Sequence, residues 1–280
     1  MRKGRVTAIL GGLAIATGLL GASTASAATL IGDYQLQGTK ASSGPGPDLT
    51  GINGVGTYQS ESVMGTTRQV LAFPQGTGLQ MSPTGLTSAN HSVVMTFRLL
   101  EDTGYNRILD WSHGTLDNGI YDNDRYANYY RPAGQGVTSN GTVFGSNTYS
   151  TMAVTTGNTL GTRLFVNGTS VVQSPYQETI IGDALRFFVD NTSGGSTGEE
   201  SAGAVSCIRV YSGVLTDAET AAIGASPDCI PHPAPQPPTN TTPTTPTTPT
   251  TPKKKCKKHK KKHRAADAKK KTCKKHKKKR

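Results

Sequence analysis

Acidic side chains gather at two places where they could bind calcium. The first group is Asp117, Asp122 and Asp124, and the second is Asp190 with Glu200. Carboxylate oxygens are ligands that calcium prefers in proteins, but neither group has the spacing of an EF-hand loop. Solvated turn residues that bond their own backbone are the alternative, and turns use Asp in this way more often. A structural calcium ion is therefore the one cofactor that the sequence indicates.

A second candidate site is the segment 121–130, which mixes tyrosines with amide and charged side chains. Carbohydrate sites combine aromatic rings with a few polar groups that fix the orientation of the ligand. Aromatic residues that alternate along a strand more often pack against a neighbouring strand, so both roles stay open. The candidate ligand-binding residues are Trp111, Tyr121, Asn123, Arg125 and Tyr129.

Catalytic patterns are weak. Residues 194–198, Gly-Gly-Ser-Thr-Gly, match the G-x-S-x-G pattern of serine hydrolases. They stand in a Ser/Gly-rich loop, with no following helix to form a nucleophile elbow. Glycosidases need two carboxylates that face one cleft, whereas Glu199 and Glu200 are adjacent in a loop. The sequence therefore predicts no catalytic residues and a protein that is not an enzyme, with a glycosidase as the alternative.

The C-terminal tail, residues 253–280, holds sixteen Lys and two Arg against one Asp, whereas residues 28–252 hold nine basic and seventeen acidic residues. A tail this basic attracts anionic wall polymers, lipid surfaces or nucleic acid without sequence specificity. No aromatic residues are interleaved for base stacking, so specific nucleic-acid recognition is not expected. The predicted polyanion-binding residues are Lys257, Lys258, Lys274 and Lys275.

Four cysteines fall into two pairs. Residues 256–259 and 273–276 each read Cys-Lys-Lys-His, a zinc ligand set in type, but the lysines around them oppose a divalent cation. A disulfide in the tail, or free thiols, is the preferred alternative. The other pair is Cys207 and Cys229, whose disulfide would hold the C-terminal segment against the sheet. A free, buried Cys207 is an equal alternative.

The elements that must position these side chains are short strands. Apolar or alternating runs recur between turn residues at 70–73, 92–99, 107–111, 150–154, 163–166, 170–173, 184–189 and 205–211. Asn167-Gly168 between two such runs predicts a type I′ hairpin. Many short strands with turn signals favour an all-β antiparallel sandwich. After the last strand, Thr216 and Glu219 fit a capping box, which predicts a short helix from Asp217 to Ala222.

Both ends of the chain differ from this central part. Residues 1–27 have a basic start, an apolar core and the small-residue site Ala25-Ser26-Ala27, which predicts a signal peptide and a secreted protein. No later segment is long and apolar enough to cross a membrane. Residues 231–252 form a Thr/Pro-rich linker with no large apolar side chain. We expect this linker to be disordered and partly polyproline II.

Five segments occur in a recognisable order: 104–110, 117–121, 164–168, 185–190 and 203–219. Together they resemble the laminin G-like, or concanavalin A-like, jelly-roll domains of secreted bacterial proteins. The most specific part is the last, a strand that ends in an aromatic residue, then a turn, Leu215, Thr216 and a short acidic helix. The resemblance implies two packed antiparallel sheets and, often, binding of glycans or other extracellular ligands, sometimes with calcium.

The sequence therefore predicts a jelly-roll domain over 28–230, followed by the linker and the disordered Lys-rich tail. We expect a secreted, non-catalytic module that recognises a glycan or another extracellular ligand. Its tail would hold it at an anionic cell surface or cell wall. A structural surface protein without a small ligand, and a jelly-roll glycosidase, are the alternatives.

Overall fold

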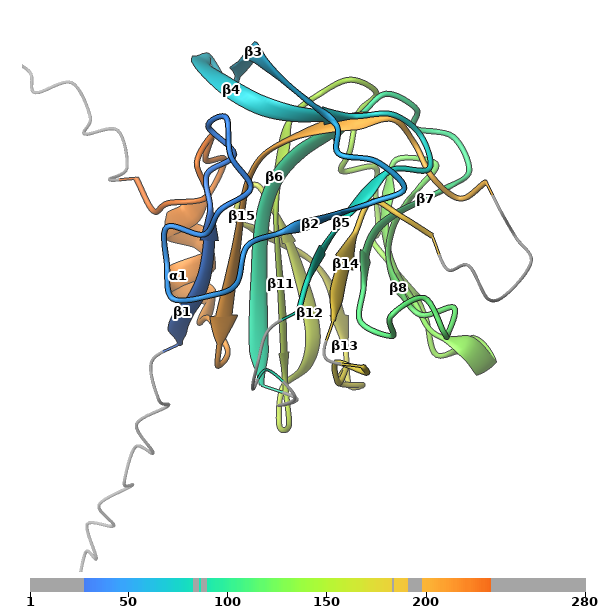
Figure 1. Ribbon diagram of the computed structural model, residues 1–280. Coiled ribbons are helices and arrows are strands. Elements are labelled where there is room, and N and C mark those ends of the chain that lie inside the picture. The colour runs from blue at the N-terminus through green and yellow to red at the C-terminus, as the bar shows by residue number, and fades with distance from the viewer. Residues whose placement is uncertain (1–27, 83–85, 87–89, 183, 191–197, 233–280) are drawn as a thin grey trace, which may run out of the picture. The chain divides into compact units, whose positions relative to one another are not determined.

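Two antiparallel sheets face each other across a shared core (Figure 1). The computed structural model of the chain describes residues 28–82, 86, 90–182, 184–190 and 198–232. The predicted signal peptide, almost all of the linker, the basic tail with its lysines and cysteines, and most of the Gly-Gly-Ser-Thr-Gly segment lie outside these residues. The predicted all-β sandwich is confirmed.

The first sheet has eight strands, one of which, β1 (Thr29–Tyr34), pairs only with β15. The order of the other seven is β13 (Thr169–Ser174), β12 (Gly161–Val166), β11 (Ser150–Gly157), β6 (His91–Leu99), β15 (Gly203–Ser212), β4 (Thr66–Phe73) and β3 (Thr57–Val63).

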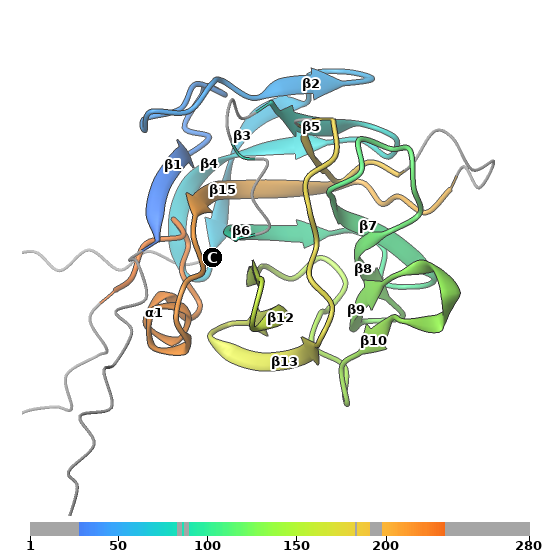
Figure 2. The ribbon, with the colours of Figure 1, turned by 90° about the horizontal axis from the view of Figure 1, so that it is seen from below.

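The second sheet has seven strands. Their order is β10 (Val137–Thr138), β9 (Tyr126–Tyr130), β8 (Gly119–Asn123), β7 (Tyr105–Asp110), β14 (Leu185–Phe187), β5 (Gly78–Met81) and β2 (Thr50–Ile52). Figure 2 shows β7, β8, β9 and β10 as neighbours at one side of the molecule. A short 3-10 helix, Pro132–Gly134, follows β9.

β15 is the strand around which the first sheet is assembled. β6 pairs with one of its edges along its whole length. Its other edge is shared, since β4 pairs with residues 203–205 and β1 with residues 208–212. This strand, near the C-terminal end of the domain, thus pairs with the N-terminal strand β1 and with β4 and β6 from earlier in the chain.

The main core lies between the sheets. Met95 and Ile208 of the first sheet and Leu109, Ile120 and Tyr129 of the second are all fully buried members of it. Burying an aliphatic or aromatic side chain stabilises a fold by about 1.5–3 kcal/mol, so this cluster supplies most of the driving force. Residues that alternate with these core positions point outward, and in the second sheet they form the site described below.

Two local predictions are confirmed. Asn167 and Gly168 have φ angles of 49° and 79°, as a type I′ turn between β12 and β13 requires. The helix α1 (Asp217–Ile223) begins with the expected capping box, in which the Thr216 hydroxyl accepts the Glu219 N–H and the Glu219 carboxylate accepts the Thr216 N–H. Sequence signals that act within a few residues thus locate these two boundaries.

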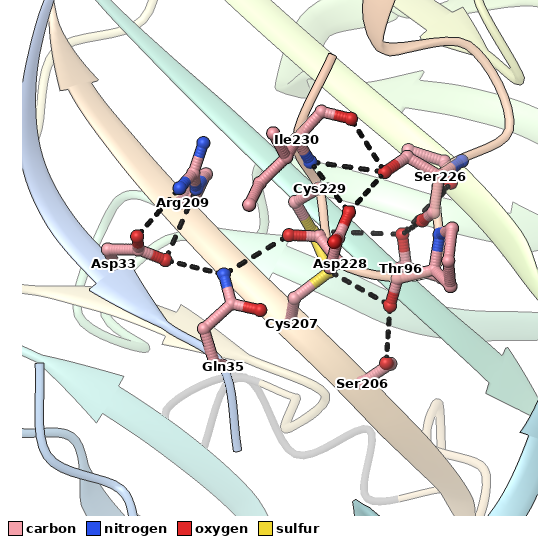
Figure 3. Close-up of a disulfide and its surroundings, with 12 residues drawn as sticks. Asp33, Gln35, Thr96, Ser206, Cys207, Arg209, Ser226, Asp228, Cys229 and Ile230 are labelled. Carbon is pink, nitrogen blue, oxygen red and sulfur yellow. Dashed lines mark hydrogen bonds and ion pairs between the residues drawn. A yellow bond between two sulfur atoms is a disulfide. The ribbon is translucent and has the colours of Figure 1, made fainter. Parts of the chain in front are cut away.

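The segment after α1 runs back across the outer face of the first sheet and is held there by a disulfide (Figure 3). Cys207 of β15 is bonded to Cys229, and both are fully buried. The backbone carbonyl of Ser226 accepts hydrogen bonds from the hydroxyls of Thr96 and Thr151, at 2.6 and 3.0 Å. The predicted disulfide is therefore present, and it pins the C-terminal segment to β15 and its neighbours.

Within the described ranges, no helix is both long and apolar enough to span a bilayer.

Candidate functional site

Three tyrosine rings from three adjacent strands meet on the outer face of the second sheet. They are Tyr105 of β7, Tyr121 of β8 and Tyr130 of β9. The ring of Tyr105 lies 5.5 Å from that of Tyr121 and 6.3 Å from that of Tyr130, between centroids, and Tyr121 lies 6.1 Å from Tyr130. The interplanar angles are 90°, 79° and 83°, so each ring stands nearly perpendicular to the other two.

These rings line a surface hollow of about 170 Å³ together with two carboxylates. The five residues that we call the tyrosine hollow are Tyr105, Asp117, Tyr121, Tyr130 and Glu199. Tyr105 is 38% exposed, Tyr130 is half-buried, and Tyr121 forms a buried wall. The hollow is smaller than the roughly 300–1,000 Å³ of sites for drug-sized ligands, so it suits one small chemical group of a larger ligand.

A buried arginine holds one side of the hollow in place. One Nη of Arg107 donates to Asp117 and to Asp190, at 3.0 Å each, and the other donates to the carbonyl of Asn118 at 2.7 Å. Its guanidinium lies over the Tyr121 ring, 4.3 Å from the centroid. Gly119 leaves room for this arrangement, since a Cβ there would lie 2.5 Å from an Nη of Arg107.

Strand pairing explains why these groups share a face. Arg107 of β7 is directly opposite Tyr121 of β8, and Tyr105 lies two residues before Arg107 on the same face. Glu199 comes from the segment before β15, and its carbonyl accepts the backbone N–H of Arg107 at 2.8 Å. Residues about 90 positions apart in sequence are thus joined at the same point of the sheet.

Negative charge accumulates in the hollow. Carboxylate oxygens of Asp117, Asp190 and Glu199 lie within 4.8 Å of one another. Burial, together with the nearby Asp190 and Asp117 carboxylates, raises the pKa of Glu199 above its ordinary value. The Tyr121 hydroxyl donates to Asp117 at 2.7 Å, which adds a further partner for that carboxylate.

The same three carboxylates form the one group that resembles a metal site among the described residues. Two of them, Asp117 and Asp190, already bind the guanidinium of Arg107. A calcium ion placed between them would face a fixed positive charge, and calcium normally collects six to eight oxygen ligands. The arrangement therefore fits the arginine better than a calcium ion, and calcium binding stays a prediction.

The calcium ligands predicted from the sequence do not form one site but lie in two separate parts of the structure. Asp117 and Asp190 meet at Arg107, while Glu200 lies beside them and accepts the backbone N–H of Asp190. Asp122 is buried and accepts the backbone N–H of Arg125, and exposed Asp124 accepts that of Gly104. The last two act as turn-stabilising acceptors, which is the alternative role stated above.

The predicted ligand-binding residues are also divided. Tyr121 belongs to the tyrosine hollow. Trp111 and Tyr129 are fully buried in the core, where the Trp111 indole donates to His91 and the Tyr129 hydroxyl donates to Glu178. Asn123 is half-buried at the end of β8, and exposed Arg125 forms an ion pair with Asp102. Only Tyr121 of the five therefore lines the hollow.

Three residues of the site were not in the predicted set: Tyr105, Tyr130 and Glu199. Tyr105 and Arg107 alternate on one strand, which is a detectable signal that both point the same way. Tyr130 directly follows Tyr129, so composition cannot say which of the two faces outward. Glu199 joins the site through a contact distant in sequence, which no local pattern predicts.

Asp122 should make the stability of the fold depend on pH. Burial raises the pKa of its carboxyl from 3.8 to about 7, so the folded protein keeps this proton where the unfolded chain has lost it. Asp122 should therefore lower stability as pH rises from about 4 to about 7. Asp122→Asn, which keeps the acceptor for Arg125, should raise the free energy of unfolding by roughly 2–4 kcal/mol above pH 8.

Urea unfolding across this pH range measures the effect. Glu101→Gln, which removes an exposed carboxylate that does not act on Asp122, serves as the control and should leave the pH profile unchanged. If Asp122→Asn and the unchanged chain lose stability in parallel as pH rises, Asp122 is not the group responsible.

Comparisons with known proteins agree with this architecture. The profile of a laminin G-type family described as the concanavalin A-like lectin/glucanases superfamily matches residues 73–221, just over half of the chain. A search of curated protein sequences returns no significant match.

Solved structures of the same architecture share little sequence with the chain. Domain 4 of AbnA, a GH43 extracellular arabinanase from Geobacillus stearothermophilus in complex with arabinotriose, has a TM-score of 0.55 and 14% identity, over 69% of this chain and 97% of that one. A botulinum neurotoxin type C structure, from work on its interaction with two ganglioside molecules, has a TM-score of 0.50 and 11% identity. The binding domain of botulinum neurotoxin DC in complex with rat synaptotagmin II has a TM-score of 0.50 and 10% identity.

In both toxin comparisons the alignment covers 69% of this chain and half of the other. At these identities the likeness shows the fold alone. The profile match, which covers the strands from the end of β4 to α1, identifies the family. The chain therefore belongs to the concanavalin A-like lectin/glucanase superfamily.

Proposed function

We propose that the chain is a secreted, non-catalytic binding module that recognises a glycan at the tyrosine hollow. The observation that carries the proposal is the set of three mutually perpendicular tyrosine rings around a hollow that also exposes carboxylates. Sugar rings offer apolar C–H faces to aromatic side chains and hydroxyl donors to carboxylates. Both kinds of contact are available within one hollow of about 170 Å³.

Rigid support favours recognition. Tyr105, Tyr121 and Tyr130 stand on paired strands, and Arg107 fixes both Asp117 and the Tyr121 ring. Groups held on strands with locked neighbours lose little conformational freedom when a ligand binds. The arrangement therefore suits a preformed site.

Structural neighbours support the ligand class by analogy. The arabinanase domain was solved with arabinotriose, and the type C neurotoxin interacts with gangliosides. The neurotoxin DC binding domain, of which the match covers half, was solved in complex with a protein, rat synaptotagmin II, so the fold by itself does not select the ligand class. The tyrosine hollow, rather than the fold, is our reason for preferring a glycan.

Secretion and attachment to an anionic surface complete the proposal. A buried disulfide between Cys207 and Cys229 fits an oxidising, extracellular compartment. The polycationic tail would hold the module at a cell envelope, with strong salt dependence. A chain that ends at Pro252 should no longer sediment with envelope fragments at low salt, and one that still does would exclude this role of the tail.

A glycan array probed with the full chain, with and without calcium, tests the binding function. We expect selective binding that Tyr105→Leu lowers at least tenfold, because the most exposed wall of the hollow is lost. Tyr105→Phe keeps the ring and should retain most of the affinity.

Tyr126→Leu is the matched control, since Tyr126 is 36% exposed and does not line the hollow. Equal losses in Tyr105→Leu and Tyr126→Leu would place the ligand elsewhere. An array with no selective binding would favour the structural surface protein without a small ligand.

A glycosidase is the second candidate function, because Asp117 and Glu199 place two carboxylates in one hollow and the pKa of Glu199 is raised. Glycoside hydrolysis uses two carboxyl groups in one cleft, of which the general acid has a raised pKa. Recovery of the array ligand after prolonged incubation decides between the two. Intact ligand supports the binding module, and cleavage that Glu199→Gln abolishes supports the enzyme.

A further inference from the structure

The aromatic rings that line the hollow make it attractive to a positive charge. Aromatic rings carry negative potential on their faces, and a cation within about 6 Å of a ring centroid is attracted to them. Tyr105, Tyr121 and Tyr130 pack edge to face with one another, and the Arg107 guanidinium already lies over the Tyr121 ring. Tyr105 and Tyr130 are the less buried two of the three, so a small cation in the hollow would lie against these two rings.

The charged groups add to this attraction. Three carboxylates, those of Asp117, Asp190 and Glu199, converge within 4.8 Å, against the single guanidinium of Arg107. Arg107 pairs with the two aspartates, and among the described residues Glu199 forms no ion pair with an arginine or lysine. The hollow therefore carries an excess of negative charge on the side lined by Glu199.

Arg107 shows within the same molecule that this environment stabilises a cation. Its guanidinium lies 4.3 Å from the centroid of Tyr121 while it binds Asp117 and Asp190. The guanidinium is fully buried, so it occupies the inner part of this environment. Glu199, Tyr105 and Tyr130 remain at the outer part, open to a ligand.

We infer that the sugar recognised in the tyrosine hollow carries a protonated amine, so that the preferred ligands are oligosaccharides of unacetylated amino sugars. This inference rests on the proposed glycan-binding function and specifies its ligand class. The ammonium group would lie against Tyr105 and Tyr130 and donate to Glu199, with the sugar ring covering the remaining exposed surface of Tyr105. Sugars that carry carboxylates, such as sialic acids, would be repelled by the same charges.

Calorimetry with the full chain at physiological salt and near-neutral pH tests the inference, because the pKa of Glu199 is raised and a lower pH would remove its charge. The probes are a glucosamine tetramer and its fully N-acetylated counterpart, which differ in charge but share the same sugar backbone. We expect the amine form to bind about tenfold more tightly, the size of one cation–π contact or charged hydrogen bond.

Matched variants separate the hollow from the general acidity of residues 28–252. Glu199→Gln should lower the affinity for the amine form five- to tenfold and leave the acetylated form unchanged. Glu101→Gln removes an exposed carboxylate that does not line the hollow and should change neither affinity. Equal losses in the two variants would mean diffuse electrostatic attraction and would overturn the inference.

The remaining outcomes are also decisive. If a lysine tripeptide competes as well as the glucosamine tetramer, the hollow takes cationic groups in general and the assignment to amino sugars fails. If a neutral glycan binds at the hollow and the amine gives no advantage, the inference fails while the proposed function stands. If neither tetramer binds and the array detects no glycan, both fail.

Discussion

Replacing Arg107 by leucine is expected to lower the free energy of unfolding by roughly 3–5 kcal/mol, the largest effect of any single substitution that we predict. The guanidinium is fully buried between Asp117 and Asp190, and Asp190 is itself only 1% exposed. Without the arginine, Asp190 would keep a buried charge that has lost its counterion. A buried charge without a counterion destabilises the folded state by far more than an ion pair at the surface stabilises it.

Two further variants check this interpretation in urea unfolding. Arg107→Lys keeps the charge but loses the planar contact with Tyr121 and the simultaneous donation to two carboxylates, so an intermediate loss is expected. Arg125→Gln removes a half-exposed arginine from its ion pair with Asp102 and should cost less than about 1 kcal/mol. A small effect of Arg107→Leu, comparable to that of Arg125→Gln, would contradict the account of the site.

Loss of the disulfide is expected to have the second largest effect. Cys207 and Cys229 are separated by 22 residues, and a loop of this length contributes about 3 kcal/mol by restricting the unfolded chain. The segment that it holds also contributes the Ser226 carbonyl to Thr96 and Thr151. The double variant Cys207→Ala and Cys229→Ala should therefore unfold at a lower urea concentration.

The tail provides a matched control, because it holds the other two cysteines. A chain with Cys256→Ala and Cys273→Ala keeps the buried disulfide, and it should match the unchanged protein in unfolding experiments. A reductant should destabilise this control chain by about as much as the Cys207/Cys229 double substitution does. If the reductant has no effect on it, the disulfide contributes little to stability.

The parts of the fold that follow local rules could be predicted. The turn at Asn167-Gly168 and the helix start at Thr216 depend on residues within three positions of each other, and both are confirmed. β3, in contrast, has the sequence TYQSESV, with few apolar residues and no clear alternation. It forms because β4 offers seven consecutive pairing partners, a tertiary effect that propensity does not record.

The site was harder to predict because the faces of strands decide it. In β7 the pairing with β8 shifts between Arg107 and Leu109, and this bulge reverses which residues point outward. Tyr105 and Arg107 therefore point to the outer face of the sheet, where neighbouring side chains bury Arg107, whereas Trp111, an even number of residues further on, lies in the core. A one-residue shift exchanges the two faces of a strand, and the sequence carries no visible mark of it.

The central claim, that the tyrosine hollow is the ligand site, is tested most directly by NMR of the full chain with labelled tyrosine rings. The chain has ten tyrosines, and exposed Tyr126 and Tyr176 lie outside the hollow. On addition of the glucosamine tetramer, or of the glycan that binds best on the array, we predict shifts confined to Tyr105, Tyr121 and Tyr130. Shifts centred on Tyr126 or Tyr176, with the three hollow tyrosines unchanged, would contradict the account.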